Sequence, residues 1–293
     1  MKQGSSLARR LAAAAYACWR PLLRRRLGRL VVERVGGMPL LVLPEVFNPR
    51  LFRTGAWLAH AIPPPAAPAA AGAVAGAPCA APAGNLRRAL DMGTGSGIGA
   101  VFAARLGYRV TAVDVNPQAV RCARINALLH GLEERIEVRL GDLFAPVAGE
   151  RFDLVLFNPP FFRGTPRGAL DAAWRSLDVI ERFAAGLPAA LAPEGRAVLL
   201  LSSAGGADRA LARHAPAGLR LEALARRGFG GEVITIVAAT WKPEAGAAGR
   251  EASVAAAAPA AAPAVPPAAA TVARAARAAT REAASDLLPA VRR

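Results

Sequence analysis

Cysteine is scarce in this sequence of 293 residues, which contains only Cys18, Cys79 and Cys122. These three lie far apart, so they provide neither a disulfide framework nor the closely spaced pairs that bind zinc. The three histidines are equally scattered and join no cysteine cluster. The sequence therefore predicts no metal site.

Long apolar runs are also missing. Two stretches without charge, residues 61–85 and 252–273, consist mainly of Ala, Pro and Gly. A transmembrane helix needs about 20 consecutive strongly apolar residues, whereas prolines interrupt both of these stretches. We therefore expect no membrane span, and we interpret the two stretches as flexible tethers.

Lysine and tyrosine are nearly absent, since Lys occurs only at positions 2 and 242 and Tyr only at positions 16 and 108. A dinucleotide-dependent oxidoreductase would need a catalytic Tyr, Lys, Ser or His near the ends of its strands. No such cluster is visible, which argues against that class of enzyme.

Acidic residues are absent from the first 30 positions, which hold eight basic residues and so half of the net charge of +16. Between residues 85 and 241, by contrast, 19 basic residues nearly balance 15 acidic ones. The basic arm could contact RNA or the ribosome with salt-sensitive affinity, or it could be a solvated arm without a partner. A deletion of residues 1–30 that leaves the salt dependence of RNA binding unchanged would contradict the first alternative.

The arm also bears on localisation. Its short apolar stretch is followed at once by Arg24, Arg25 and Arg26, and no small-x-small cleavage site precedes a mature domain, which argues against a signal peptide. A transit peptide is an alternative, because the arm is rich in Arg and free of acid. We expect a cytoplasmic protein.

Short β-rich runs alternate with helical patterns between residues 86 and 241, which favours a parallel sheet with helices on both faces. The predicted strands are 88–93, 108–115, 135–142, 151–158, 195–203, 219–227 and 232–241. The predicted helices are 97–107, 116–131, roughly 169–191, and 207–214. The last two strands are linked through Gly228, Gly230 and Gly231, which indicates an antiparallel hairpin. The fold class is therefore α/β: a Rossmann-like, doubly wound mixed sheet of seven strands with a terminal hairpin.

Five regions follow from these patterns. The sequence predicts a basic arm with helical character at 1–30 and a segment at 31–62 that is too small to fold alone and packs on the core. An Ala/Pro-rich linker at 63–84 leads to the central domain at 85–242. The tail at 243–293 is of low complexity and is expected to be mostly disordered.

The first functional signal is the sequence DMGTGSG, between the first predicted strand and the helix after it. Asp91 precedes glycines at 93, 95 and 97, which let the backbone approach a ligand and present amide groups at a helix N-terminus. The turn also fits the dinucleotide pattern, with Asp114 where that pattern has its ribose-binding acid. Two classes of cofactor remain open on this signal alone.

Further marked residues follow the other predicted strands. Gly141 and Asp142 end the third strand, and the tetrapeptide Asn158-Pro159-Pro160-Phe161 ends the fourth. Because the carboxyl ends of parallel strands meet at one edge of a sheet, where such sheets bind ligands, we expect these residues to share a site with Asp91 and Asp114.

At this point the sequence resembles the class I S-adenosylmethionine (SAM) methyltransferases. The Asn-Pro-Pro-Phe end of the fourth strand resembles the branch that methylates planar, sp²-bound nitrogens. The resemblance covers about residues 46–241 and implies the same seven-stranded sheet that the strand pattern predicts. It leaves the arm, the linker and the tail unexplained.

The resemblance implies a role for each matching residue. Asp91 and the turn of Gly93, Thr94, Gly95 and Gly97 would hold the methionine part of SAM. Asp114 would accept hydrogen bonds from both ribose hydroxyls, next to Asn116. Asp142 would accept from the adenine amine, with the Leu143 amide on a ring nitrogen and Phe144 near the ring. Phe47, Pro49 and Thr54 would lie near the cofactor.

The tetrapeptide suggests how a weak nucleophile could be activated. The lone pair of an amide or aromatic NH2 nitrogen is delocalised into the neighbouring π system. The Asn158 side-chain oxygen and the Pro159 carbonyl could each accept one N–H and so aim the lone pair at SAM. Pro159 and Pro160 fix the backbone φ and hold these acceptors in place, and Phe161 could stack on the flat group.

Several substrates remain open. Enzymes with this tetrapeptide methylate glutamine in release factors, other protein glutamines, adenine N6 or guanine N2. DMGTGSG together with DVNPQAVRCARINA most resembles the release-factor glutamine methyltransferases, and the nearly neutral central domain also favours a protein substrate. RNA or DNA bases are the alternative, as is a SAM-binding module without catalysis that contacts RNA through the arm.

Overall fold

The computed structural model describes residues 28–52, 54–65, 86–203, 206–229 and 232–242. Nearly all of the predicted arm, most of the predicted linker and the predicted tail lie outside these residues. The segment predicted at 31–62 and the central domain predicted at 85–242 lie almost entirely within them.

The centre of the fold is a seven-stranded mixed sheet in the order β10-β11-β9-β6-β3-β4-β5. Its strands are β3 (Arg88–Met92), β4 (Arg109–Asp114), β5 (Ile136–Leu140), β6 (Phe152–Phe157), β9 (Leu191–Ser202), β10 (Leu219–Phe229) and β11 (Glu232–Trp241). The five strands from β9 to β5 are parallel, and β11 runs antiparallel to both β9 and β10. The predicted fold class and its terminal hairpin are confirmed.

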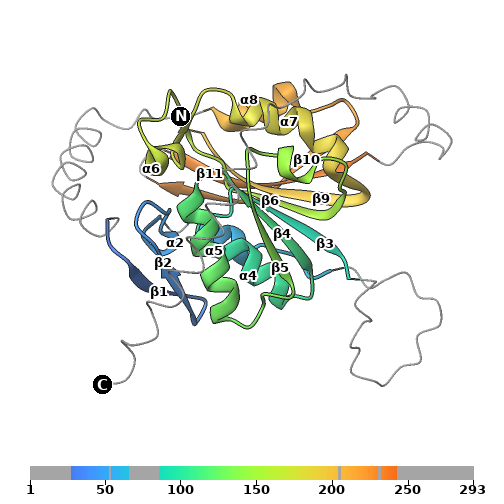
Figure 1. Cartoon of the computed structure of the whole chain (residues 1–293). Helices are drawn as coiled ribbons and strands as arrows, with labels where there is room; N and C mark the ends of the chain where they lie inside the picture. Colours follow the sequence, from blue (N-terminus) through green and yellow to red (C-terminus); the bar gives the residue numbers. More distant parts are fainter. Residues whose placement is uncertain (1–27, 53, 66–85, 204–205, 230–231, 243–293) are drawn as a thin grey trace, which may run out of the picture. The chain divides into compact units, whose positions relative to one another are not determined.

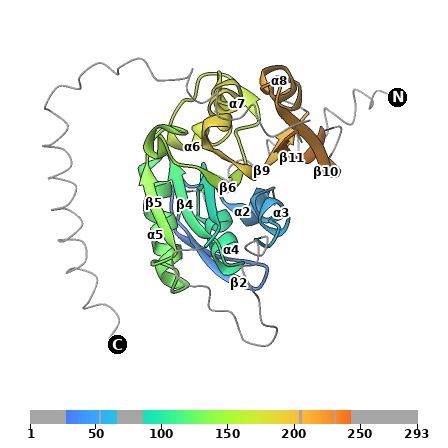
Figure 2. The same ribbon diagram turned by 90° about the vertical axis from the view of Figure 1, so that its right-hand side faces the viewer.

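Helices cover both faces of this sheet (Figures 1 and 2). The helices α4 (Ile98–Arg105) and α5 (Pro117–Leu129) lie on one face, and α7 (Val179–Ala190) and α8 (Ala207–His214) on the other. Each face has its own apolar cluster. The strand β6 contributes Leu154 and Leu156 to one cluster and Val155 to the other, all fully buried, which explains its unbroken apolar sequence.

The single helix predicted for roughly 169–191 is wrong. The structure has a short helix α6 (Ala169–Ala172), then a two-residue strand β8 (Arg175–Ser176), and only then α7. The strand β8 pairs with β7 (Phe162–Arg163), and the Phe162 amide donates to the Trp174 carbonyl at 2.8 Å. This pairing overrides the helical pattern of the sequence. We call residues 161–178 the insert.

The segment before the linker packs on the face of the sheet that α4 and α5 cover. It forms a hairpin of β1 (Val31–Val35) and β2 (Met38–Val42), followed by α2 (Pro49–Phe52) and α3 (Thr54–His60). The fully buried Asn126 of α5 accepts from the Leu41 amide at 2.8 Å, and its NH2 donates to the Leu41 carbonyl at 2.7 Å and the Ser96 carbonyl at 2.8 Å. One side chain therefore joins this hairpin to the glycine turn.

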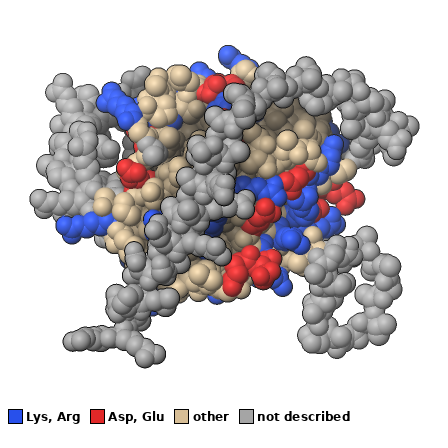
Figure 3. All heavy atoms as spheres, viewed as in Figure 1, with Lys and Arg blue, Asp and Glu red and all other residues tan. Residues whose placement is uncertain are grey.

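Charged side chains of both signs lie side by side on the face shown in Figure 3. At the amino ends of the parallel strands, Arg87 pairs with Asp153 at 2.7 Å and Arg88 pairs with Glu150. Such pairs leave no surface of a single charge there, in line with the balanced composition of the central domain. Within the part of the chain that the structure describes, no helix is long and apolar enough to cross a membrane.

Candidate active site

A cavity of about 380 Å³ opens at the carboxyl ends of β3, β4 and β6. Of the residues predicted for the glycine turn, the ends of the strands and the tetrapeptide, all but Gly97 line this cavity. These lining residues are Asp91, Gly93, Thr94, Gly95, Asp114, Asn116, Gly141, Asp142, Leu143, Asn158, Pro159, Pro160 and Phe161. The topology thus gathers residues that are far apart in the sequence, as open parallel sheets do at this edge.

The glycine turn between β3 and α4 needs left-handed backbone. Gly93, Gly95 and Gly97 have φ values of 62°, 56° and 81°, a region that costs other residues strain. Gly97 faces away from the cavity, because a side chain there would meet the Ala123 backbone of α5 at 3.0 Å. Gly97 is thus part of the turn but does not line the cavity.

Asp91 lies buried beneath this turn. One of its carboxylate oxygens accepts from the Thr94 hydroxyl at 2.6 Å and from the Ala100 amide at 2.8 Å. Burial raises the pKa of Asp91 to about 6, although both hydrogen bonds act in the opposite direction. A methyl group at Gly99 would lie 2.5 Å from the other carboxylate oxygen, so this glycine makes room for Asp91.

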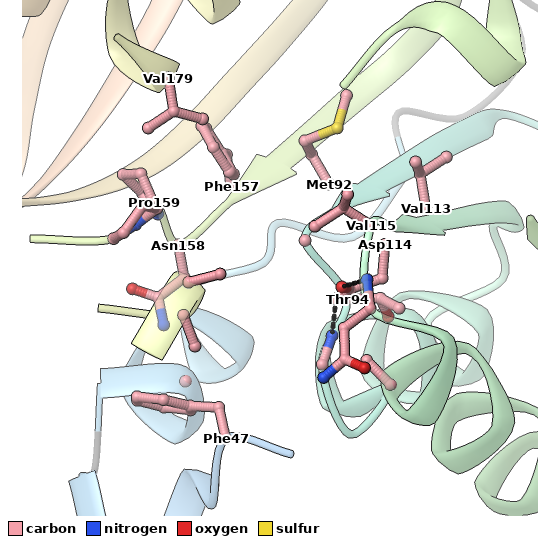
Figure 4. A pocket seen from close by; sticks show the side chains of 18 of the residues that line it. Phe47, Met92, Thr94, Val113, Asp114, Val115, Phe157, Asn158, Pro159 and Val179 are labelled. Atoms are coloured by element: carbon pink, nitrogen blue, oxygen red, sulfur yellow. Dashed lines mark hydrogen bonds between the residues drawn. The ribbon is translucent and has the colours of Figure 1, made fainter. Parts of the chain in front are cut away.

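Asp114 ends β4 across from Asp91. One carboxylate oxygen accepts from the Gly95 amide and the other from the Asn116 amide, each at 2.8 Å (Figure 4). Burial is also the largest cause of the raised pKa of Asp114. The Asn116 side chain caps α5 through the Gln118 amide at 2.9 Å, and its NH2 donates to the Glu45 carbonyl at 3.0 Å. This bond connects the end of β4 to the segment before the linker.

Asp142 is the most exposed of the three predicted carboxylates. Its side chain is 54% exposed and pairs with Arg182 of α7 at 2.5 Å. Leu143 follows with a positive φ of 46°, which turns the chain at the cavity edge. Phe144 does not line the cavity, since its ring packs on that of Phe183 at 5.3 Å.

Asn158 follows β6 on the opposite side of the cavity from Thr94 and Asp114 (Figure 4). Its Oδ1 is buried and has no hydrogen-bond partner among the described residues. An unpaired buried acceptor costs about 1–3 kcal/mol. Because Asn158 lines the cavity, its Oδ1 is a candidate hydrogen-bond acceptor for an N–H group of a ligand.

The comparison with protein families matches residues 80–217 to the methyltransferase small domain. A putative protein N5-glutamine methyltransferase of Methanocaldococcus jannaschii is 32% identical over 47% of this chain and 73% of its own length. The chain belongs to this family of SAM-dependent methyltransferases.

Other members of the methyltransferase family match over shorter stretches. A ribosomal protein uL3 glutamine methyltransferase of Bradyrhizobium diazoefficiens is 37% identical over 38% of this chain and 39% of its own length. A release factor glutamine methyltransferase of Rhodospirillum rubrum is 42% identical over 37% of this chain and 38% of its own length. The chain spans about two fifths of the length of these relatives.

Among solved structures, the T. thermophilus 16S rRNA N2 G1207 methyltransferase in complex with AdoMet and guanosine has a TM-score of 0.50. It is 21% identical, and the match covers 73% of this chain and 50% of that one. This likeness concerns the fold, which is that of a class I methyltransferase.

The residues of the cavity fit the SAM that this family uses. Each oxygen of the Asp114 carboxylate takes one backbone N–H and keeps further acceptor capacity, which suits a pair of neighbouring hydroxyls. The turn of Gly93 and Gly95 brings backbone to the cavity wall without side chains. The volume of about 380 Å³ falls within the range of about 300–1,000 Å³ for small-molecule sites.

The sequence pattern missed the insert as part of this site. Pro166, Trp174, Arg175 and Ser176 all line the cavity, together with Arg182 of α7. No signal in the sequence marked them: Trp174, Arg175, Ser176 and Arg182 fall within the helix predicted for 169–191, and Pro166 lies in the loop before it. Of the residues suggested before the linker, Phe47 and Pro49 line the cavity, whereas Thr54 is buried and does not line it.

Proposed function

We propose that this protein transfers a methyl group from SAM to the nitrogen of a planar NH2 group. The observation that carries the proposal is the buried Oδ1 of Asn158, which has no partner among the described residues and belongs to a residue that lines the same cavity as the glycine turn and Asp114. An N–H of the acceptor would satisfy this oxygen. We call the part of the cavity around Asn158 and the insert the acceptor half, and the part around the glycine turn and Asp114 the cofactor half.

In the cofactor half, each residue has a distinct proposed task. Asp91, Thr94 and the turn of Gly93, Gly95 and Gly97 hold the methionine part of SAM. Asp114 accepts from the ribose hydroxyls with Asn116 beside it, and Asp142 and Leu143 contact the adenine. Bound there, SAM would supply an electrophilic methyl group.

In the acceptor half, catalysis is positioning and electrostatics. Asn158 Oδ1 and the Pro159 carbonyl each accept a hydrogen bond from one N–H of the NH2 group that is to be methylated. These two bonds direct the nitrogen lone pair toward the cofactor half. Pro159 and Pro160 keep these acceptors rigid. Phe161 packs partly into the core and forms a flat apolar wall. The methylated nitrogen then loses one proton to water.

The substrate that fits best is a glutamine side chain of a protein. The relatives whose names specify glutamine methylation of release factors and of protein uL3 support this choice, as does the mixture of charges on the face shown in Figure 3. The test is incubation with methyl-labelled SAM and the total protein and RNA of the cell, followed by mass spectrometry of the labelled fraction. Label on N5 of a protein glutamine is the expected result, and label on an RNA base would replace glutamine as the substrate.

The affinity for SAM should rise with pH through about 6. Asp91 has its pKa raised by burial to about 6, and burial raises the pKa of Asp114 as well. If SAM requires ionised Asp91, its affinity falls about tenfold between pH 7 and pH 5. Calorimetric titrations from pH 5 to pH 8 measure this slope, and Asp91→Asn should remove the part that Asp91 contributes. A flat profile in the unmodified protein would contradict the role of Asp91.

The raised pKa of Asp91 also makes the stability of the fold depend on pH, in the direction opposite to the affinity for SAM. Because folded Asp91 keeps its proton above the ordinary pKa of 3.8, its contribution to stability is full below that pH. It is lost as the pH rises through about 6. Without SAM, the contribution of Asp91 to the melting temperature should therefore become more favourable as the pH falls below about 6. The affinity for SAM should weaken over the same range.

A further inference from the structure

Two segments outside the seven-stranded sheet contribute lining residues to the acceptor half. Phe47 and Pro49 come from the segment before the linker, and Pro166 and Trp174 come from the insert. The rings of Phe47 and Trp174 are 5.0 Å apart, and Phe52 meets Trp174 edge-on at 4.3 Å and 82°. The two segments thus meet at the cavity in one cluster of Phe47, Phe52 and Trp174, which we call the aromatic wall.

Trp174 is fixed on its own side of this cluster. Its carbonyl accepts from the Phe162 amide at 2.8 Å, and its amide donates to the Asp171 carbonyl at 2.9 Å. On the other side, the Cβ of Phe47 lies 4.0 Å from where a Cβ of Gly95 would stand. The aromatic wall therefore reaches from the glycine turn to the insert, and Trp174 is its outer end.

The size of the cavity limits what this wall admits. Its volume of about 380 Å³ lies near the lower end of the range of about 300–1,000 Å³ for sites that enclose one small molecule. SAM, with a nucleoside and an amino acid, is itself such a molecule. Once it is bound, only part of this volume is left for the acceptor group.

Two arginines that line the cavity near this wall each pair with an acidic residue. Arg175 pairs with Asp171 at 3.4 Å and lies over the Phe162 ring at 5.8 Å. Arg182 pairs with Asp142 at 2.5 Å. The acceptor half therefore presents aromatic rings, prolines and the Asn158 oxygen, which suit an uncharged planar group.

We propose that Trp174 is the residue that determines acceptor specificity, because it narrows the acceptor half to an unbranched side-chain amide and excludes a purine base. This inference rests on the proposed methyl transfer. The exclusion is steric, since the ring of Trp174 is held in place by Phe47 and Phe52.

The test compares Trp174→Ala with two control variants. Trp174→Phe keeps an aromatic wall, and Leu177→Ala changes an exposed residue of the same insert that does not line the cavity. Each protein is incubated with methyl-labelled SAM and total cell protein and RNA, and the ratio of RNA label to protein label is measured. The affinity for SAM is measured in parallel by calorimetry.

The unmodified protein should label protein. In Trp174→Ala the ratio of RNA label to protein label should rise at least tenfold, while the affinity for SAM changes less than threefold. The ratio should stay within threefold in Trp174→Phe and Leu177→Ala. A role in folding alone would lower both labels equally and leave the ratio unchanged, which would overturn the inference.

The outcomes separate the inference from the function it rests on. If the unmodified protein labels RNA and this label requires Asn158, methyl transfer stands and the inference about Trp174 is wrong. If it labels neither fraction, the proposed function fails and the inference fails with it.

Discussion

Replacement of Asn158 by Ala should reduce turnover by about 10²- to 10³-fold, the scale on which loss of one well-placed hydrogen-bonding group slows catalysis. The acceptor NH2 would lose the oxygen that draws its lone pair out of conjugation. The affinity for SAM should change little, because Asn158 lies across the cavity from Thr94 and Asp114. Methyl transfer to the labelled fraction and calorimetry with SAM measure the two effects separately.

Asn158→Ala should lose no stability. The Oδ1 of Asn158 is buried without a partner among the described residues, so its removal takes away a cost of about 1–3 kcal/mol. The melting temperature of Asn158→Ala should therefore equal or exceed that of the unmodified protein. Gln118→Ala, which removes an exposed amide side chain, is the control and should retain turnover. Full activity in Asn158→Ala would exclude Asn158 from the mechanism.

Replacement of Asp114 by Ala should weaken SAM binding by about 100-fold or more. Each hydrogen bond to a charged group contributes about 1.5–3 kcal/mol, and two ribose hydroxyls would lose their acceptor. The variant also removes the carboxylate that fixes the amides of Gly95 and Asn116. Calorimetric titration with SAM measures the loss.

Asp153→Ala is a matched control for this variant. Asp153 is also a partly buried carboxylate that accepts a backbone N–H, that of Arg88 at 2.7 Å, but it lies at the opposite end of the parallel strands. It should cost stability through the pair with Arg87 and leave SAM binding within twofold. A SAM affinity in Asp114→Ala within threefold of the unmodified protein would show that Asp114 does not hold the cofactor.

The strands of the sheet and most of its helices could be predicted because their signals are local. Apolar strand runs, the cap formed by Asn116 and Pro117, and the glycine turn each act within a few residues of the chain. The parallel strands then bring Asp91, Asp114 and Asn158 to one edge by topology alone. The cavity that contains them follows from the same rule.

The insert could not be predicted, for a reason that is visible in its contacts. The pairing of Phe162 with Trp174 joins residues 12 positions apart, and the hydroxyl of Ser176 accepts from the Val179 amide at 3.2 Å where α7 begins. Neither contact leaves a periodic trace in the sequence. The same holds for Asn126, which appears as one more polar residue of a helix until Leu41 and Ser96 are placed beside it.

The origin of the aromatic wall has an evolutionary consequence. Phe47 and Trp174 belong to short stretches on either side of the framework that carries Asp91 and Asp114. The stretch around Phe47 is not free to change, because the Glu45 carbonyl accepts from Asn116 of the cofactor half. Exchange of the insert, by contrast, would change the acceptor half while the hydrogen bonds of Asp91 and Asp114 stay as they are. Variation of this one short stretch would therefore let the same framework take a different acceptor.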